Sequence, residues 1–233
     1  MFAVSPLIII FIVLLLSGPV AAAGRVQSLS ARLLLVIAMV VLLQPCICSV
    51  ADAFYISTFA DGGSSLVDGV AATTASFNLP YQTWIDTSET FLYVAELYNC
   101  RVRQVSLVAN TVTTFAGTGI SCGSAVSAGD GLAATAATLY LPFGIGGDSV
   151  GRIFISEFYT RVYVVNASSS GSNSRIIQTY AGSGNQGSGG DGGLGAAATA
   201  QLYAPYYVAV DTGGNLFIAD NNNHKIRKVQ YYY

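Results

Sequence analysis

Hydrophobic and polar positions divide this chain into two unlike parts. The first part holds two apolar runs, Leu7 to Leu16 and Leu33 to Leu43, and its only charged side chains before residue 52 are Arg25 and Arg32. After residue 53, short β-branched and aromatic runs alternate with turns rich in Gly, Asp and Asn. Such runs are typical of strands. The pattern predicts a hydrophobic N-terminal segment, residues 1–53, followed by an all-β domain.

The N-terminal segment has the charge order and small residues of a secretory signal peptide. Each apolar run is shorter than the ~20 residues of a membrane span. Arg32 precedes the second run and small residues follow at Ser49 to Ala53, so we expect cleavage after Ala53. The first run is open to three interpretations, namely a signal, a membrane anchor, or an extension from a mis-assigned start codon. Buried core helices are disfavoured because neither run has a polar face. We expect a secreted or membrane-anchored extracellular protein.

The pattern after residue 53 repeats three times with a period of roughly sixty residues. Each unit has a Thr–aromatic–Ala run, a Gly-rich loop with an Asp-Gly pair, an Ala-rich stretch, a proline, and an aspartate six residues later. Two more runs follow, one ending in a carboxylate and one mixing basic and apolar residues. Each unit therefore supplies four short strands. We name them a (after the proline), b (ending in the carboxylate), c (basic and apolar) and d (Thr–aromatic–Ala).

Four antiparallel strands repeated at fixed spacing are typical of β-propeller blades. The repeats resemble the NHL family, most fully at Pro205 to Val229, where P-x5-D is followed by GNLFIAD and NHKIRKV. Asn223-His224 stands where that family has its Asn-His pair. The first repeat departs from it with Asn99-Cys100, and the second runs Phe158-Tyr159-Thr160 into Arg161. The resemblance implies a partial propeller of three blades over 54–233, with repeats at about 54–116, 117–181 and 182–230.

Antiparallel strands alternate in direction, so the b–c turns and the long d–a loops share one face, which we call the loop face. Binding often lies on such loops. The candidate binding residues are the strand-end carboxylates, the turn residues beside them, and the aromatic residue after each proline: Glu96, Glu157, Asp220, Asn99, Asn223, His224, Tyr81, Phe143 and Tyr206. The structural alternatives are favoured. The carboxylates can cap turns or pair with strand c, the rings can pack between blades, and His224 can serve as a turn residue.

Charge and residue counts argue against several classes of function and partner. Of ten Lys and Arg residues eight follow residue 53, against eleven of twelve Asp and Glu residues, so nucleic acid is not an expected partner. His224 is the only histidine, and each Asp-Gly pair stands alone among Gly and Ala, so we expect no metal site, no cofactor and no Ser-His-Asp relay. The resemblance then favours a non-catalytic module binding a protein or glycan. The alternatives are a propeller enzyme of lyase or lactonase type and a structural fragment.

Two cysteines remain after the predicted cleavage, because Cys46 and Cys48 lie in the signal segment. Cys100 falls in the first b–c turn and Cys122 in the following d–a loop, both on the loop face. An even number of cysteines in an oxidising compartment predicts a disulfide between them.

The ends of the repeat array do not match. The last unit has strands a, b and c, whereas a spare d-like run, Tyr55 to Ala60, precedes the first unit. A closed ring of three blades falls below the usual range of four to eight. Either two chains exchange these strands in a six-bladed homodimer, or the sequence is a truncated gene model.

Asn166 opens the sequon Asn166-Ala167-Ser168 in a Ser-rich c–d turn on the face opposite the loop face. We expect this asparagine to carry a glycan when the protein passes through a eukaryotic secretory pathway. Glycosidase treatment should then increase gel mobility. Unchanged mobility would contradict the assignment.

Overall fold

The computed structural model describes residues 55–119, 122, 129–166, 175–192 and 196–231, and Ser57–Tyr233 forms one compact unit. The predicted signal segment 1–53 and two of the three sequon residues lie outside these ranges. Within the described ranges, no helix is both long and apolar enough to cross a membrane.

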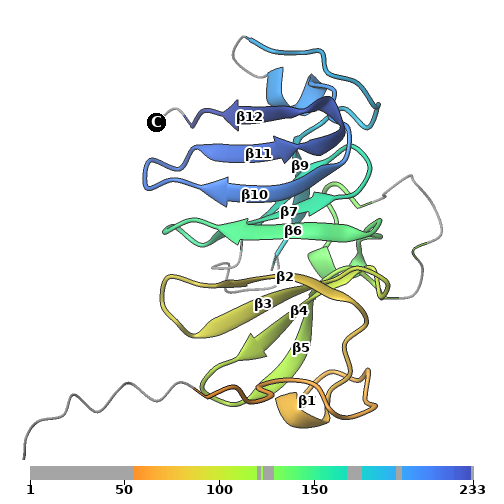
Figure 1. Ribbon diagram of the computed structural model, residues 1–233, viewed down its shortest axis with the longest axis vertical. Helices are drawn as coiled ribbons and strands as arrows, with labels where there is room; N and C mark the ends of the chain where they lie inside the picture. Colours follow the sequence, from red (N-terminus) through yellow and green to blue (C-terminus); the bar gives the residue numbers. More distant parts are fainter. Residues whose placement is uncertain (1–54, 120–121, 123–128, 167–174, 193–195, 232–233) are drawn as a thin grey trace, which may run out of the picture. The chain divides into compact units, whose positions relative to one another are not determined.

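The described residues form three antiparallel sheets, which we call blades 1, 2 and 3 (Figure 1). Blade 1 contains β2 (Pro80–Ile85), β3 (Phe91–Glu96), β4 (Arg101–Ser106) and β5 (Thr111–Ala116), with β1 (Val70–Ala71) outside β5. Blade 2 contains β6 (Pro142–Gly147), β7 (Arg152–Glu157), β8 (Val162–Asn166) and β9 (Ile177–Ala181). Blade 3 contains β10 (Pro205–Val210), β11 (Leu216–Asp220) and β12 (Lys225–Val229). Four short 3₁₀ helices lie in the loops and turns, at Ala72–Thr74, Ala134–Ala136, Ala196–Thr199 and Asn221–Asn223.

The strand order confirms the four-stranded unit predicted from the sequence, with strands a, b, c and d adjacent in blades 1 and 2. The spare d-like run is different. Tyr55 to Ala60 contains no strand, and Tyr55 and Ile56 are 89% and 99% exposed. A strand is stable only when its backbone N–H and C=O groups pair with a neighbour, and none of the described strands pairs with this run.

The aspartate six residues after each proline closes the a–b turn. Asp86 Oδ1 accepts hydrogen bonds from the backbone N–H groups of Thr90 and Phe91 at 2.7 and 2.9 Å. Asp211 accepts in the same way from Gly213 and Asn215. Hydrogen bonds from the Asn215 side chain and backbone hold the pKa of Asp211 below its usual value. These bonds explain why the repeat places an acid at this position.

Hydrogen bonds between blades join the innermost strands. The backbone N–H of Ile145 in β6 donates to Gln82 Oε1 of β2 at 3.0 Å. Ser156 Oγ accepts from the N–H of Gly144 at 2.9 Å and donates to the carbonyl oxygen of Tyr206 in β10 at 3.1 Å. One polar side chain from each interface therefore fixes the position of β6 between β2 and β10.

Glycine permits this close approach. A Cβ atom at Gly144 would lie 2.4 Å from Ser156 Oγ and 2.5 Å from the carbonyl oxygen of Tyr206. At Gly147 a Cβ atom would lie 2.5 Å from the Trp84 ring. Any larger residue at these positions would push the blades apart.

Two apolar clusters fill the interfaces between blades. The first joins blades 1 and 2 and includes Tyr93, Phe115, Ile145 and Ile177. The second joins blades 2 and 3 and includes Phe154, Val162, Leu202, Val208 and Ile218. A third cluster lies within the outer part of blade 1, around Val112. The largest part of the described core therefore belongs to the interfaces and not to any single sheet.

The carboxylate at the end of strand b is buried in every blade. Glu96 is fully buried, and its Oε1 accepts from the backbone N–H of Asn78 at 3.0 Å and from Asn99 Nδ2 at 2.8 Å. Its Oε2 accepts from Arg101 Nε at 2.5 Å. Buried charges are tolerated when they are paired and hydrogen-bonded in this way.

Blades 2 and 3 repeat this anchor. Glu157 accepts from the backbone N–H of Tyr140 at 2.6 Å. Asp220 accepts from the N–H of Tyr203 at 2.8 Å, from Asn223 Nδ2 at 2.8 Å and from Arg227 Nη1 at 3.2 Å. In each blade the donor N–H comes from the residue two positions before the strand-a proline, so the carboxylate fixes the end of the long loop to the sheet.

A disulfide joins Cys100 to Cys122, with their Cα atoms 5.4 Å apart. This confirms the pairing predicted from the sequence and places the first b–c turn beside the following d–a loop. The chain separation is 22 residues.

We expect Cys100 and Cys122 to be oxidised in the unreduced secreted protein, and peptide mapping by mass spectrometry should find them in one linked peptide pair. In the chain-entropy model a loop of this length contributes about 3 kcal/mol to the free energy of unfolding. Urea unfolding of a Cys100→Ala, Cys122→Ala double variant should show this loss. Two free thiols at these positions would refute the pairing.

We expect Asp220→Ala to lower the free energy of unfolding by about 3 kcal/mol, because it leaves the part-buried Tyr203 N–H without an acceptor, removes one of the two acceptors of Asn223 Nδ2 and removes one partner of the buried Arg227. Asp211→Ala is the matched control. It removes an exposed strand-end aspartate with similar backbone bonds and should cost about 1 kcal/mol. Urea unfolding measures both losses of free energy, and equal losses would contradict the anchoring role of Asp220.

Candidate functional site

Five aromatic side chains lie in contact at the loop-face end of the innermost strands, and we call them the aromatic cluster: Tyr81, Phe143, Phe158, Tyr206 and Tyr207. Phe143 is the centre of the cluster. Its ring centroid lies 4.4 Å from that of Tyr81, 4.6 Å from that of Tyr206 and 5.5 Å from that of Phe158. Tyr207 stacks on Tyr81 at 6.0 Å. All three blades therefore contribute to one aromatic surface.

A β-bulge in each strand a places these rings. The strand-a proline pairs with the strand-b carboxylate in every blade, and the register shifts immediately afterwards. In β6 the shift leaves Phe143 as the extra residue, because Pro142 pairs with Glu157 and Gly144 with Ser156. In β10 the same shift leaves Tyr206 as the extra residue. Bulges redirect side chains, so the shift brings each ring toward its neighbours.

The cluster combines a buried floor with open sides. Phe143 is 7% exposed, whereas Tyr81 and Tyr207 are 41% and 44% exposed. Interaction with the Tyr81 side chain is the main cause that raises the pKa of Tyr207 above its usual value. The result is a set of flat apolar faces with hydroxyl groups at their edge, an arrangement suited to an amphipathic ligand.

The strand-end carboxylates proposed as binding residues are the buried anchors described above. Glu96, Glu157 and Asp220 are each at most 1% exposed. All three accept hydrogen bonds from the backbone of the preceding loop, and Glu96 and Asp220 also accept from Arg side chains. The geometry thus favours the structural alternative, and ligand binding by these groups stays a prediction.

The turn residues have two different roles. Asn99 and Asn223 donate from Nδ2 to the neighbouring carboxylate, and Asn223 Nδ2 also lies 2.6 Å from the carbonyl oxygen of Gly187. His224 and Cys100 occupy the next position and have φ angles of 55° and 47°. The Asn of the Asn-His pair therefore binds the anchor, and the His occupies the left-handed residue that closes the turn.

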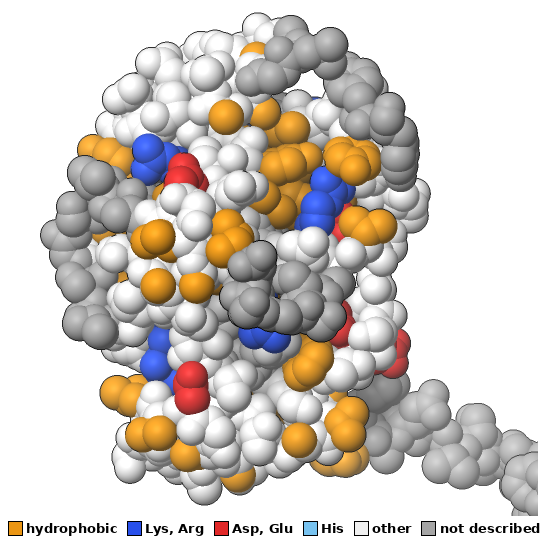
Figure 2. All heavy atoms as spheres, turned by 180° about the vertical axis from the view of Figure 1, so that it is seen from behind, with side chains coloured by type: hydrophobic (Ala, Val, Ile, Leu, Met, Phe, Trp, Pro, Cys, Tyr) orange, Lys and Arg blue, Asp and Glu red, His pale blue; other side chains and the backbone are white. Residues whose placement is uncertain are grey.

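The charged groups on the loops are mostly paired. On the side of the molecule seen in Figure 2, some Lys and Arg side chains lie beside Asp or Glu side chains. Arg103 contacts Asp68 at 3.4 Å, and Arg227 contacts Asp191 at 2.7 Å. Among the residues that the structure describes, no group of three or more His, Cys, Asp or Glu side chains is arranged to hold a metal ion.

Sequence reasoning selected three members of the aromatic cluster and missed Phe158 and Tyr207. Phe158 follows the Glu157 carboxylate in the irregular second b–c turn, and Tyr207 is the second of two adjacent tyrosines. An aromatic pair at the start of strand a was a usable signal. However, period-2 alternation assigns adjacent residues to opposite sides of a strand, and only the bulge allows Tyr206 and Tyr207 to share one cluster.

Comparison with known proteins agrees with this fold. The family model described as NHL repeat matches residues 207–229. A structural genomics protein of unknown function from Bacteroides thetaiotaomicron is similar in structure, with a TM-score of 0.51, 17% identity, and coverage of 68% of this chain and 37% of that one. An auxiliary nutrient binding protein from Bacteroides ovatus gives a TM-score of 0.49 at 20% identity, covering 68% of this chain and 38% of that chain.

Streptogramin B lyase is also similar, with a TM-score of 0.32 and 13% identity, covering 66% of this chain and 54% of that one. No curated protein matches the sequence. The chain spans 36% to 38% of the length of the first three solved structures that it resembles. The predicted resemblance is confirmed: residues 207–229 match the NHL repeat, and the described blades have the fold of part of a β-propeller.

Proposed function

We propose that this protein is a non-catalytic extracytoplasmic binding module whose ligand lies on the aromatic cluster. The observation that carries the proposal is the contact of five aromatic rings from three blades at the loop-face end of the innermost strands. Strand contacts and hydrogen bonds fix these rings before any ligand arrives, so little conformational entropy is lost on binding.

The exposed tyrosines indicate the chemistry of the ligand. Tyr81 and Tyr207 present apolar ring faces with their hydroxyls at the edge. A sugar ring has matching chemistry, with an apolar face of C–H groups surrounded by hydroxyls. We therefore favour a glycan, and a protein ligand is the alternative that the experiment distinguishes.

The non-catalytic assignment rests on the burial and hydrogen bonding of the strand-end carboxylates beside the aromatic cluster. Glu96 and Asp220 stand opposite the prolines that precede Tyr81 and Tyr206. Both are fully buried, and both are hydrogen-bonded to arginine and asparagine side chains. A general base must be free to reach the proton that it removes. These groups are held by the fold instead.

The extracytoplasmic assignment rests on the Cys100–Cys122 disulfide. Structural disulfides form and persist in oxidising compartments and are rare in the cytosol. This agrees with the predicted signal segment. Whether the segment is cleaved or anchors the protein to a membrane is a separate part of the proposal.

The test is a glycan array probed with the full chain, followed by calorimetric titration of the best oligosaccharide. Tyr81→Ala with Tyr207→Ala should weaken binding by about 5- to 160-fold, because each ring contributes about 0.5–1.5 kcal/mol of stacking. Tyr98→Ala is the control, since Tyr98 is 60% exposed in the first b–c turn but lies outside the aromatic cluster.

Equal affinities in all variants would refute the aromatic cluster as the site. If the array gives no signal and the double variant loses its binding to a protein partner, the ligand of the aromatic cluster is a protein instead. Stoichiometric zinc or calcium in the purified protein would favour the enzyme of lyase or lactonase type instead.

A further inference from the structure

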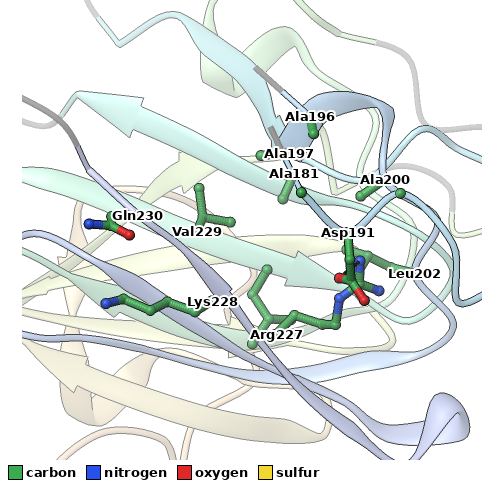
Figure 3. A pocket seen from close by; sticks show the side chains of 13 residues that line it. Ala181, Asp191, Ala196, Ala197, Ala200, Leu202, Arg227, Lys228, Val229 and Gln230 are labelled. Carbon is green, nitrogen blue, oxygen red and sulfur yellow. Dashed lines mark ion pairs between the residues drawn. The ribbon is translucent and has the colours of Figure 1, made fainter. Parts of the chain in front are cut away.

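The outer edge of blade 3 is open in the described part of the chain. There β12 pairs only with β11, whereas the corresponding strands β4 and β8 also pair with β5 and β9. A cavity of about 430 Å³ lies along β12 (Figure 3). Its apolar lining includes Ala197, Ala200, Ile218 and Val229.

The two complete blades show what fills this position. In blade 1 the equivalent side chains surround Val112: Ala72, Ala75, Val94 and Val105. In blade 2 they surround Ile177: Ala134, Ala137, Ile155 and Val165. Val112 and Ile177 are fully buried and belong to strand d. The cavity beside β12 therefore corresponds in position to the β-branched side chain of strand d in the other two blades.

The loop carboxylate of blade 3, Asp191, indicates a second contact that a strand d paired with β12 would make. Thr114 Oγ1 donates to Asp68 at 2.9 Å in blade 1, and Thr179 donates to Asp130 from both Oγ1 and N–H in blade 2. Asp191 is the equivalent carboxylate. Its side chain is 69% exposed and contacts Arg227, and Figure 3 shows the two side chains directed at each other beside the cavity. A threonine two residues after the β-branched residue would complete the pattern.

The run before the first blade has this sequence. Ile56 to Ala60 reads Ile-Ser-Thr-Phe-Ala, against Val-Thr-Thr-Phe-Ala at Val112 to Ala116 and Ile-Gln-Thr-Tyr-Ala at Ile177 to Ala181. Ile56 is 99% exposed and Phe59 is 46% exposed. The run therefore has the residue types of a strand d, but its side chains are exposed instead of buried.

The end of this run is already held in the register of a strand d. The backbone N–H of Asp61 donates to the carbonyl oxygen of Ala72 at 2.9 Å. Gly117 and Gly182, which follow β5 and β9, donate in the same way to Ala134 and Ala197, both at 2.9 Å. Each strand d thus leads into the loop of the next blade, and Tyr55 to Ala60 leads into blade 1.

This run cannot reach β12 of its own molecule. Asp61 is fixed to blade 1, and Thr58 lies three residues earlier, a reach of about 10 Å. Blades 1 and 3 are separated by blade 2, with β1 and β12 at opposite ends of the fold in Figure 1. Sheets pack about 10 Å apart, so this separation is about 20 Å.

We propose that β12 accepts Tyr55 to Ala60 of a second copy of this chain, and that the exchange is reciprocal. Ile56 of one copy then fills the cavity of the other, and Thr58 donates to Asp191. Three blades from each copy give six, within the usual range of four to eight. A reciprocal contact of this kind closes as a two-fold symmetric dimer. The predicted cleavage after Ala53 leaves the run in the mature chain. The proposal does not depend on the ligand of the aromatic cluster.

The register of the exchanged strand can be tested by a cross-link in the full chain. Thr113 pairs with Gln104 in blade 1 and Gln178 with Val164 in blade 2, so Ser57 should pair with Lys228 of the other copy. Ser57→Cys with Lys228→Cys should give a covalent dimer on a non-reducing gel. Ser57→Cys with Ile226→Cys is the control, two residues out of register and beyond the reach of a disulfide.

A cross-link confined to one chain would overturn the proposal, as would the absence of any cross-link. Equal amounts of dimer from both cysteine pairs would also overturn it, because the register would then be wrong.

Light scattering provides an independent measurement. The full chain should have the mass of two copies, and Ile56→Asp should have the mass of one, because burying a carboxylate against the side chains of Ala200, Ile218 and Val229 is unfavourable. Ser57→Asp is the matched control and should stay dimeric, since its counterpart Gln178 is exposed. A monomeric or undefined aggregated parent chain, or an Ile56→Asp variant that stays dimeric, would overturn the proposal.

Discussion

The buried carboxylate at the end of strand b is the interaction on which the loop face depends. In each blade it accepts the N–H of the residue two positions before the strand-a proline, as Glu96 does from Asn78 at 3.0 Å. That bond holds the end of a long glycine-rich loop against the sheet. The proline, the bulge and the aromatic ring follow within the next three residues. A misplaced anchor would therefore move the ring that depends on it.

Arginine side chains of strand c also hold the middle of the loop. Arg103 Nη1 and Nη2 donate to the carbonyl oxygens of Leu66 and Val67, and Arg227 donates to those of Gln201 and Gly189. Burial lowers the pKa of Arg103, and the neighbouring Arg101 lowers it further. The guanidinium groups are thus placed where backbone carbonyls and carboxylates compensate for lost hydration. Loops without much secondary structure are held mainly by side chains of strand c.

The sequence predicted the repeating elements well because each is short, periodic and bounded by a distinct turn residue. Strand b of blade 3 and strand c of blade 3 have the predicted bounds, Leu216–Asp220 and Lys225–Val229. The Cys100–Cys122 pairing followed from the two cysteines that remain after the predicted cleavage, and strand alternation placed both on the loop face. Tyr55 to Ala60 was the exception. Its composition is that of a strand, but pairing depends on a partner edge that local sequence cannot supply.

The candidate site was harder to predict. The rings after the three prolines were selected from their positions, yet strict alternation cannot place Tyr206 and Tyr207 in one cluster. The register shift in β10 does so, and bulges have no reliable sequence signal here. The opposite problem affected the carboxylates. A recurring acid on a binding face looks functional, and only the three-dimensional contacts of Glu96 and Asp220 show how fully the fold uses them.

The anchors have a further consequence for how such a chain can change over evolution. Each carboxylate and the loop that it holds belong to one blade, as do the arginine partners of Glu96 and Asp220. The contacts between blades use apolar side chains, backbone atoms, glycines and a few polar groups. A duplicated segment of one period would bring its own loop support with it and would need only a complementary neighbour. Whole blades can therefore be gained as units, while the residues between anchors in each loop are free to diverge toward different ligands.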